Sequence, residues 1–185
     1  DHGEEFWDHG GFEHGHTLYG ELTHTPLIMT GPGIPTGTVR TVVGHRDLFR
    51  ALITASGAEL PANVGGTDLL DIAQKGAWAG ERTVVSENVL YGPGLLSSVE
   101  DGHRLVLNQL TGAGEVWAVA ADASERTRLQ GAPQSETAHK MLPRLEAMRG
   151  GSLAPVEIND TRIPNPTTFE QLAALGYIDA ATPAE

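Results

Sequence analysis

The chain has 185 residues, 39% of them hydrophobic and 19% charged, which is typical of one globular domain or of part of a larger one. Its 24 acidic residues outnumber its 12 basic residues, and the net charge of −12 argues against a nucleic-acid partner, because that affinity depends on clustered Lys and Arg. The absence of cysteine excludes disulfides and thiolate metal sites within the chain, so any metal here needs nitrogen and oxygen ligands.

The first 24 residues hold five of the eight histidines, together with many glycines and acidic residues. This stretch has no sustained period, so we expect a loop that lies over a site. The apolar run Pro26–Met29 predicts a buried strand, which the turn residues 30–33 end. The β-branched residues of Thr38–Val43 predict a second strand.

Apolar residues at helical spacing predict a helix over residues 45–55, which Gly57 ends. A shorter helix is expected over residues 67–72, capped by Thr67. Beyond Gly80 the pattern changes to short strands separated by turns such as Asp101-Gly102, which predicts an antiparallel meander. The expected strands are 83–86, 96–99, 104–107 and 116–120.

Two more helices are expected near the end of the chain, over residues 135–148 and 168–175. The Pro-rich stretch 163–166 between them is typical of a linker. No internal repeat is visible, and no apolar run reaches the roughly 18 to 20 residues that a membrane-spanning helix needs. The chain begins at Asp1 without a Met, which we interpret as a piece of a longer protein.

Asp1 and His2 are the first candidate metal ligands. At a strand end that turns into a loop, two adjacent side chains can face one ion, and Gly3 gives the backbone that freedom. A carboxylate favours hard cations and an imidazole favours transition metals, so these two residues leave Ca²⁺, Mg²⁺, Mn²⁺ and Zn²⁺ open.

His9, His14 and His16 follow in a glycine-broken loop, where imidazoles near a cation can bind an anionic ester or protonate its leaving group. Their spacing matches neither H-E-x-x-H nor a zinc-finger ligand set. The alternative is an exposed loop whose histidines only cap turns, but five histidines beside an opening D-H-G-E favour a site. His24 is equally consistent with a site residue and with a buried imidazole at the entrance to an apolar strand, whereas His45, His103 and His139 stay outside the expected site.

The opening D-H-G-E, the stretch G-F-E-H-G-H-T-L-Y-G-E at 11–21 and T-P-L-I at 25–28 resemble one ordered motif block. That block, S-D-H-G-E … H-G-H-T-L-Y-x-E … V-P-L-I, belongs to the sulfatases of the alkaline-phosphatase-like superfamily of metal-dependent sulfo- and phosphoester hydrolases. Later stretches such as V-G-H-R-D-L-F at 43–49 and the E-Q-L-A-A-L-G-Y finish at 170–177 extend the likeness. The resemblance covers nearly the whole chain, but only the C-terminal portion of the family.

The resemblance implies an α/β fold, in which this chain is the C-terminal part of an alkaline-phosphatase-like α/β sandwich plus a small antiparallel β-sheet subdomain with a packed helix. Residues 1–80 would finish the catalytic α/β domain, whose earlier strands lie upstream. Residues 81–150 would form the small subdomain, and residues 151–185 a linker with a C-terminal helix or tail.

The resemblance also implies a fragment of a metal-dependent sulfatase that hydrolyses sulfate esters. Asp1 would be a metal ligand and His2 a second ligand or its neighbour, with Ca²⁺ the first expectation ahead of Mg²⁺, Mn²⁺ and Zn²⁺. His14 or His16 would contact the sulfate and its leaving oxygen. The nucleophile of this family is a formylglycine made from Cys or Ser in a C/S-x-P-x-R element, which this chain lacks. We therefore expect the nucleophile upstream and the isolated segment to be inactive.

Two alternatives stay open: a phosphoester or phosphonate hydrolase or phospho-group transferase of the same superfamily, and a non-catalytic metal-binding remnant. The expected partners are a small-molecule or glycan sulfate ester and the missing N-terminal half of the same protein. We expect no nucleic-acid partner and no membrane segment in this chain. The resemblance implies a periplasmic or otherwise extracytoplasmic location.

Overall fold

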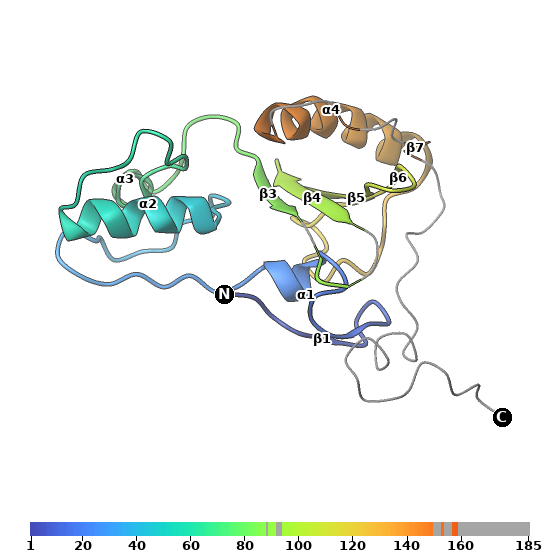
Figure 1. Ribbon diagram of the computed structural model, residues 1–185, viewed down its shortest axis with the longest axis horizontal. Coiled ribbons are helices and arrows are strands. Elements are labelled where there is room, and N and C mark those ends of the chain that lie inside the picture. The colour runs from blue at the N-terminus through green and yellow to red at the C-terminus, as the bar shows by residue number, and fades with distance from the viewer. Residues whose placement is uncertain (88, 92–93, 150–152, 154–156, 159–185) are drawn as a thin grey trace. The chain divides into compact units, whose positions relative to one another are not determined.

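A computed structural model describes residues 1–87, 89–91, 94–149, 153 and 157–158 (Figure 1). The chain divides into two compact units, described one at a time: the sheet unit, residues 1–25 and 85–185, and the helical unit, residues 26–84. Among the described residues, no helix has the length and apolar character needed to cross a membrane.

The sheet unit is built on a five-stranded sheet in the order β3-β4-β5-β6-β7. The strands β4, β5 and β6 form the predicted antiparallel meander, and a two-residue turn with positive φ at Asp101 and Gly102 joins β4 to β5. The short β7 pairs with β6 in parallel, which the sequence did not predict. The strand bounds are Val84–Glu87 (β3), Leu95–Glu100 (β4), His103–Asn108 (β5), Ala113–Trp117 (β6) and Glu157–Ile158 (β7).

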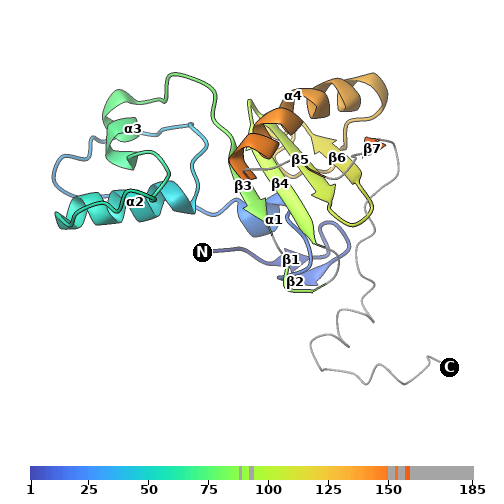
Figure 2. The same cartoon turned by 45° about the horizontal axis from the view of Figure 1, so that its top comes forward.

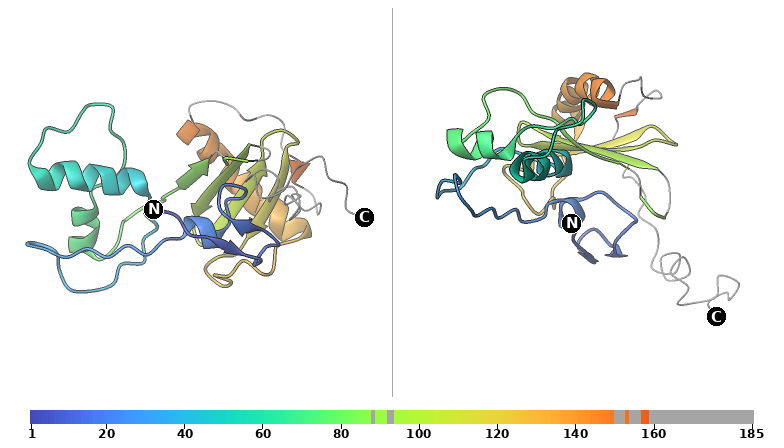
Figure 3. Two further views of the ribbon diagram at one scale, coloured as in Figure 1. Left: turned by 60° about the horizontal axis from the view of Figure 1, so that its bottom comes forward. Right: turned by 60° about the vertical axis from the view of Figure 1, so that its left-hand side comes forward.

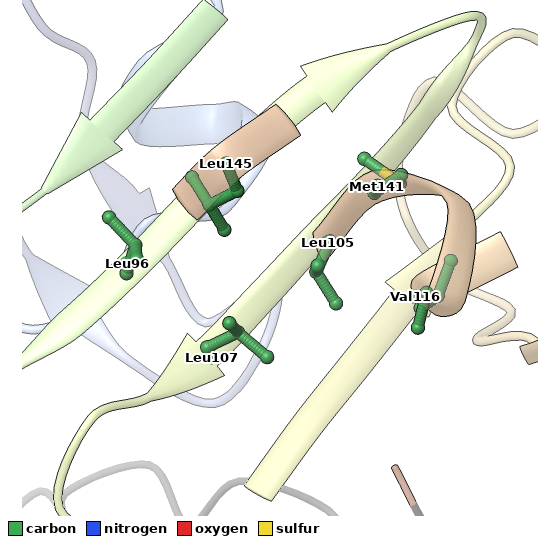
Figure 4. Packing of buried hydrophobic residues seen from close by; sticks show 7 residues of the cluster. Leu96, Leu105, Leu107, Val116, Met141 and Leu145 are labelled. Carbon is green, nitrogen blue, oxygen red and sulfur yellow. The ribbon is translucent and has the colours of Figure 1, made fainter. Parts of the chain in front are cut away.

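The helix α4, Gly131–Arg149, lies across one face of this sheet (Figure 2). Side chains of a strand alternate between its two faces, so Leu105 and Leu107 of β5 point toward α4. Met141 and Leu145 of α4 pack over them, as Figure 4 shows. The helix confirms the expectation for residues 135–148 and begins four residues earlier.

The N-terminal segment, residues 1–25, covers the opposite face of the sheet (Figure 3). Val106, which alternates with its two neighbours in β5, packs there with Leu18, Tyr19 and Trp117. The segment contains the strands β1, Glu5–Phe6, and β2, Phe12–Glu13, and the short helix α1, Gly20–Thr23. The histidine-rich stretch is therefore supported by the apolar face of the sheet.

The helical unit contains α2, His45–Ser56, and α3, Leu69–Lys75. Gly57 ends α2 in the left-handed conformation, as predicted, whereas Asp68 rather than Thr67 caps α3. The buried Asp47 carboxylate joins three parts of this unit, accepting hydrogen bonds from the backbone of Gly44 and Thr67 and from the Arg82 guanidinium.

Two predicted strands are wrong: Pro26–Met29 and Thr38–Val43 contain no strand, and Ile28 is 90% exposed. An apolar run becomes a strand only beside partner strands, and residues 14–83, all described, contain none. The expected helix 168–175 and linker 163–166 lie outside the described residues. The domain division at residues 80 and 150 stays a prediction.

Candidate active site

A small antiparallel hairpin joins the candidate residues Asp1 and His2 to His14 and His16. Its strands β1 and β2 pair Glu5 with Glu13 and Phe6 with Phe12. The turn between them closes through a hydrogen bond from the Trp7 amide to the carbonyl of Gly11, 2.8 Å long. This register places the next residue on each side, Glu4 and His14, opposite each other.

The hairpin is fixed to α1 through Gly3. The Gly3 amide donates to the carbonyl of Leu22 at 2.9 Å. A Cβ atom on residue 3 would lie 1.9 Å from the backbone oxygen of Glu21, so only glycine fits in this close approach. The contact fixes the backbone immediately after Asp1 and His2.

His2, Glu4 and His14 form the exposed cluster of the candidate site. The ring centroids of His2 and His14 are 4.3 Å apart, and His14 Nδ1 lies 2.8 Å from Glu4 Oε1. One ligand atom from each of the three side chains lies within 4.8 Å of the others. His14 and Glu4 are 47% and 39% exposed, so a substrate could reach them.

The donor set of this cluster fits a divalent cation. His2 Nδ1 lies 2.9 Å from the carbonyl of Gly3, and because a carbonyl only accepts, the other ring nitrogen of a neutral imidazole keeps its lone pair. The Glu4 Oε2 atom is buried and has no hydrogen-bond partner among the described residues. Asp1 is exposed, and the cluster of potential ligands does not include it.

His16 lies in a different environment from His14. It is 1% exposed, and its ring stacks on Tyr91 with 5.1 Å between the centroids. Neither ring nitrogen has a hydrogen-bond partner within the described part of the chain. Burial lowers the pKa of His16, so its imidazole is held neutral at physiological pH. The Tyr91 amide also donates to the carbonyl of Gly15 at 2.8 Å, which fixes the position of the stack.

His9, which we also singled out, lies beneath the hairpin rather than in the exposed cluster. Its Nδ1 is 2.5 Å from Glu21 Oε1 and its Nε2 is 2.8 Å from the carbonyl of Glu125. The ring stacks on Tyr19 at 4.0 Å. Burial lowers the pKa of His9, but the hydrogen bonds to Glu21 and Glu125 outweigh burial and raise it above its ordinary value.

Glu5 is the most deeply buried carboxyl group near the hairpin, at 0% exposure. Burial raises the pKa of Glu5 to about 7, and the neighbouring Glu21 carboxylate acts in the same direction. Its carboxyl therefore exchanges a proton near neutral pH. The sequence did not single out Glu5 because an acidic residue in a histidine-rich stretch reads as exposed.

The structure brings together two of the four predicted site residues. His2 and His14 share the exposed cluster, Asp1 is exposed outside it, and His16 is buried against Tyr91. Sequence reasoning missed Glu4 and Tyr91. Glu4 belongs to the quoted D-H-G-E motif, so its acidic side chain could have marked it as a site residue. Tyr91 is 75 positions from His16, and nothing in the sequence links the two residues.

The relatives of this chain by sequence are arylsulfatases. It is 35% identical over 79 residues to arylsulfatase K of Canis lupus familiaris, a match over 42% of this chain and 15% of that protein. It is 36% identical over 76 residues to arylsulfatase K of Homo sapiens, over 40% of this chain and 14% of that protein. The chain thus spans about a seventh of these relatives, and no protein-family model matches it.

A solved structure shares the fold. The crystal structure of a putative sulfatase from Bacteroides thetaiotaomicron VPI-5482 superposes with a TM-score of 0.55 at 23% sequence identity. The match covers 72% of this chain and 30% of that one. The likeness confirms the predicted α/β fold.

Proposed function

Because this chain is related in sequence to the sulfatases and shares their fold over most of its length, we propose that the full-length protein hydrolyses sulfate esters. The observation that carries the proposal is the exposed cluster, in which His14 is held by Glu4 beside His2 at the start of the chain. In the reaction the sulfur–oxygen bond to the leaving group breaks, water is consumed, and sulfate and an alcohol are released.

Asp1 and His2 are the proposed metal ligands in this chain, with Ca²⁺ the first candidate because further carboxylate ligands are expected upstream. A bound cation would polarise the sulfuryl oxygens and orient the nucleophile, which we expect to be an upstream formylglycine. The lone pair left on His2 by its contact to Gly3 and the buried Glu4 oxygen support a cation at this end of the hairpin.

His14 is the proposed residue that protonates the leaving oxygen. Its Nδ1 lies 2.8 Å from Glu4 Oε1 and donates to that carboxylate, so the proton that His14 would give in the reaction is the one on Nε2 of the doubly protonated ring. Glu4 holds the ring in place and fixes its tautomer, as a carboxylate does in other acid–base pairs. The exposed ring can meet a substrate directly.

His16 has a different proposed role. A buried neutral imidazole cannot supply a cationic contact, but its one N–H, which has no partner among the described residues, can donate a hydrogen bond to a sulfate oxygen. Tyr91 would hold the ring at the required angle through the stack. The proposal therefore divides the work that sequence reasoning left open between His14 and His16.

The test uses purified full-length protein with matched aryl sulfate and aryl phosphate substrates, and peptide mass mapping of its nucleophile. Turnover of the sulfate and a Cys or Ser converted to formylglycine are the expected results. Turnover of the phosphate alone, with an unmodified Ser or Thr, would move the proposal to phosphoester chemistry. No turnover of either would leave a non-catalytic protein. The family's extracytoplasmic location is part of this proposal, and a reporter fusion would test it.

A further inference from the structure

A second cluster of ionisable side chains lies beneath the hairpin, away from the exposed cluster. Glu5 comes from β1, His9 from the hairpin turn and Glu21 from α1. One ligand atom from each lies within 4.8 Å of the other two. The cluster is buried, because Glu5 is 0% exposed and the side chains of His9 and Glu21 are 6% and 16% exposed.

Glu5 points into this cluster without a hydrogen bond of its own. Neither of its carboxylate oxygens has a partner of normal hydrogen-bond geometry among the described residues. The Thr17 hydroxyl lies near enough to lower the pKa of Glu5 but also makes no hydrogen bond of normal geometry there. A buried carboxylate in this state costs free energy unless a cation or a proton satisfies it.

Gly11 leaves the space that this carboxylate occupies. A Cβ atom on residue 11 would lie 2.5 Å from Glu5 Oε2. A larger residue there would therefore push the Glu5 carboxylate out of its present position.

His9 is oriented as metal-binding histidines usually are. Its Nε2 lies 2.8 Å from the backbone carbonyl of Glu125, and because a carbonyl only accepts, Nε2 carries the hydrogen. The other nitrogen, Nδ1, faces Glu21 Oε1 at 2.5 Å. Metal-binding histidines commonly donate their second N–H to a carbonyl in this way, which fixes the tautomer and the ring angle.

The net negative charge of the cluster is suited to a divalent cation. Glu21 and the imidazole of His9 can balance each other through one shared proton, but that leaves the Glu5 carboxylate without a counter-charge. The nearby Arg104 is committed to Glu125, with Nε 2.5 Å from Oε1. A divalent cation in place of the shared proton would balance both carboxylates at once.

We propose that Glu5, His9 and Glu21 form a divalent-cation site that links the hairpin to α1. This site is separate from the one proposed at Asp1 and His2. One imidazole and two carboxylates suit Zn²⁺ or Mn²⁺. Binding needs His9 Nδ1 and Glu21 Oε1 to separate to about 3 Å, since each ligand atom lies about 2 Å from such an ion. The proton between them leaves to solvent.

The experiment measures metal binding, so its outcome does not depend on catalysis. Full-length protein is stripped with a chelator and titrated with Zn²⁺, metal content is measured by mass spectrometry, and Co²⁺ serves as the spectroscopic probe. The variants are Glu5→Gln and Glu21→Gln, which keep side-chain size and remove one charge. The matched control is Glu13→Gln, which lies opposite Glu5 on β2 and belongs to neither cluster of potential ligands.

We expect each of Glu5→Gln and Glu21→Gln to lower the affinity for one equivalent of Zn²⁺ at least tenfold and to change the Co²⁺ spectrum, while Glu13→Gln keeps both. Glu21 is at the edge of the cluster, so its variant still gives an answer if Glu5→Gln fails to fold. Unchanged binding in both variants, or an equal loss in Glu13→Gln, overturns the proposal. If the unmodified full-length protein binds this one equivalent of Zn²⁺ but does not hydrolyse a sulfate ester, only the proposed function is contradicted.

Discussion

Arg104 and Glu125 form a buried ion pair that connects the sheet to the histidine-rich segment. Arg104 Nε donates to Glu125 Oε1 at 2.5 Å, and the two side chains are 5% and 2% exposed. Other atoms of the pair bind the histidine-rich segment. Arg104 Nη1 donates to the carbonyl of Leu18, and the Gly20 amide donates to Glu125 Oε2. The carbonyl of Glu125 accepts a hydrogen bond from His9 Nε2. A single ion pair thus fixes the histidine-rich segment at three points.

Replacing Arg104 by Met should therefore destabilise the sheet unit strongly. The substitution leaves the Glu125 carboxylate buried without its cation, which typically costs about 3–5 kcal/mol. Urea unfolding followed by tryptophan fluorescence measures the change, because Trp117 is buried in the same unit. The control is Arg126→Met, at an exposed arginine next to Glu125, which should stay within about 0.5 kcal/mol of the original chain. Equal stabilities of the two variants would contradict a structural role for the pair.

The buried His16 should make stability fall in acid. Because burial lowers the pKa of His16 in the folded chain below its ordinary 6.5, the unfolded chain takes up the proton first as pH falls. The stabilising contribution is complete above about pH 6.5 and decreases below it. His16→Phe keeps an aromatic ring against Tyr91 but cannot be protonated. Unfolding free energies at pH 8 and pH 5.5 should show the original chain losing more stability than the variant, and equal losses would contradict the prediction.

Local signals in the sequence predicted the elements that need only local information. The apolar spacing of α2 and its terminal Gly57 fixed that helix, and the Asp101-Gly102 turn fixed the pairing of β4 with β5. Pro26–Met29 carried an equally clear strand signal, but a strand depends on partner strands that are distant in sequence. The exposed Ile28 shows that this partner is absent from the described residues.

For the candidate site too, residues close in sequence were predictable and distant ones were not. The motif block identified His2 and His14, because residues of one short hairpin are close in both sequence and space. Tyr91 comes from a distant segment that meets His16 only after the sheet has formed. The cluster of Glu5, His9 and Glu21 depends on burial under the hairpin, and a polar sequence gives no indication of burial for single carboxylates.

Gly3→Ala should disrupt the junction of hairpin and helix. The added Cβ would meet the backbone oxygen of Glu21 at 1.9 Å, and backbone cannot move aside as a flexible side chain can. We expect a loss of about 1–3 kcal/mol in unfolding free energy and lower turnover in the full-length protein, because His2 is displaced. Gly37→Ala is the matched control, since nothing lies within 4 Å of a Cβ there. A Gly3→Ala variant as stable as Gly37→Ala would contradict the close approach.

The roles given to His14 and Glu4 predict a dependence on the leaving group. His14→Ala in the full-length protein should lower kcat by about 10²–10⁴-fold for an alkyl sulfate, whose leaving oxygen needs a proton. The loss should be much smaller for 4-nitrophenyl sulfate, whose anion leaves without one. Glu4→Gln keeps an acceptor for His14 Nδ1 but removes the charge, so its loss should be intermediate, roughly 10-fold. His24→Ala, at an exposed histidine outside the cluster, is the control.

Comparing the two substrates separates a chemical role of His14 from a positional one. A variant that has only lost substrate positioning loses activity toward both sulfates alike, whereas a missing proton donor affects only the poor leaving group. Because the His14 side chain is 47% exposed, its removal should leave the unfolding free energy within about 0.5 kcal/mol of the original chain. An equal loss on both substrates would therefore move the proton-donating role away from His14, and the same comparison applied to His16→Phe would show whether the buried imidazole carries it.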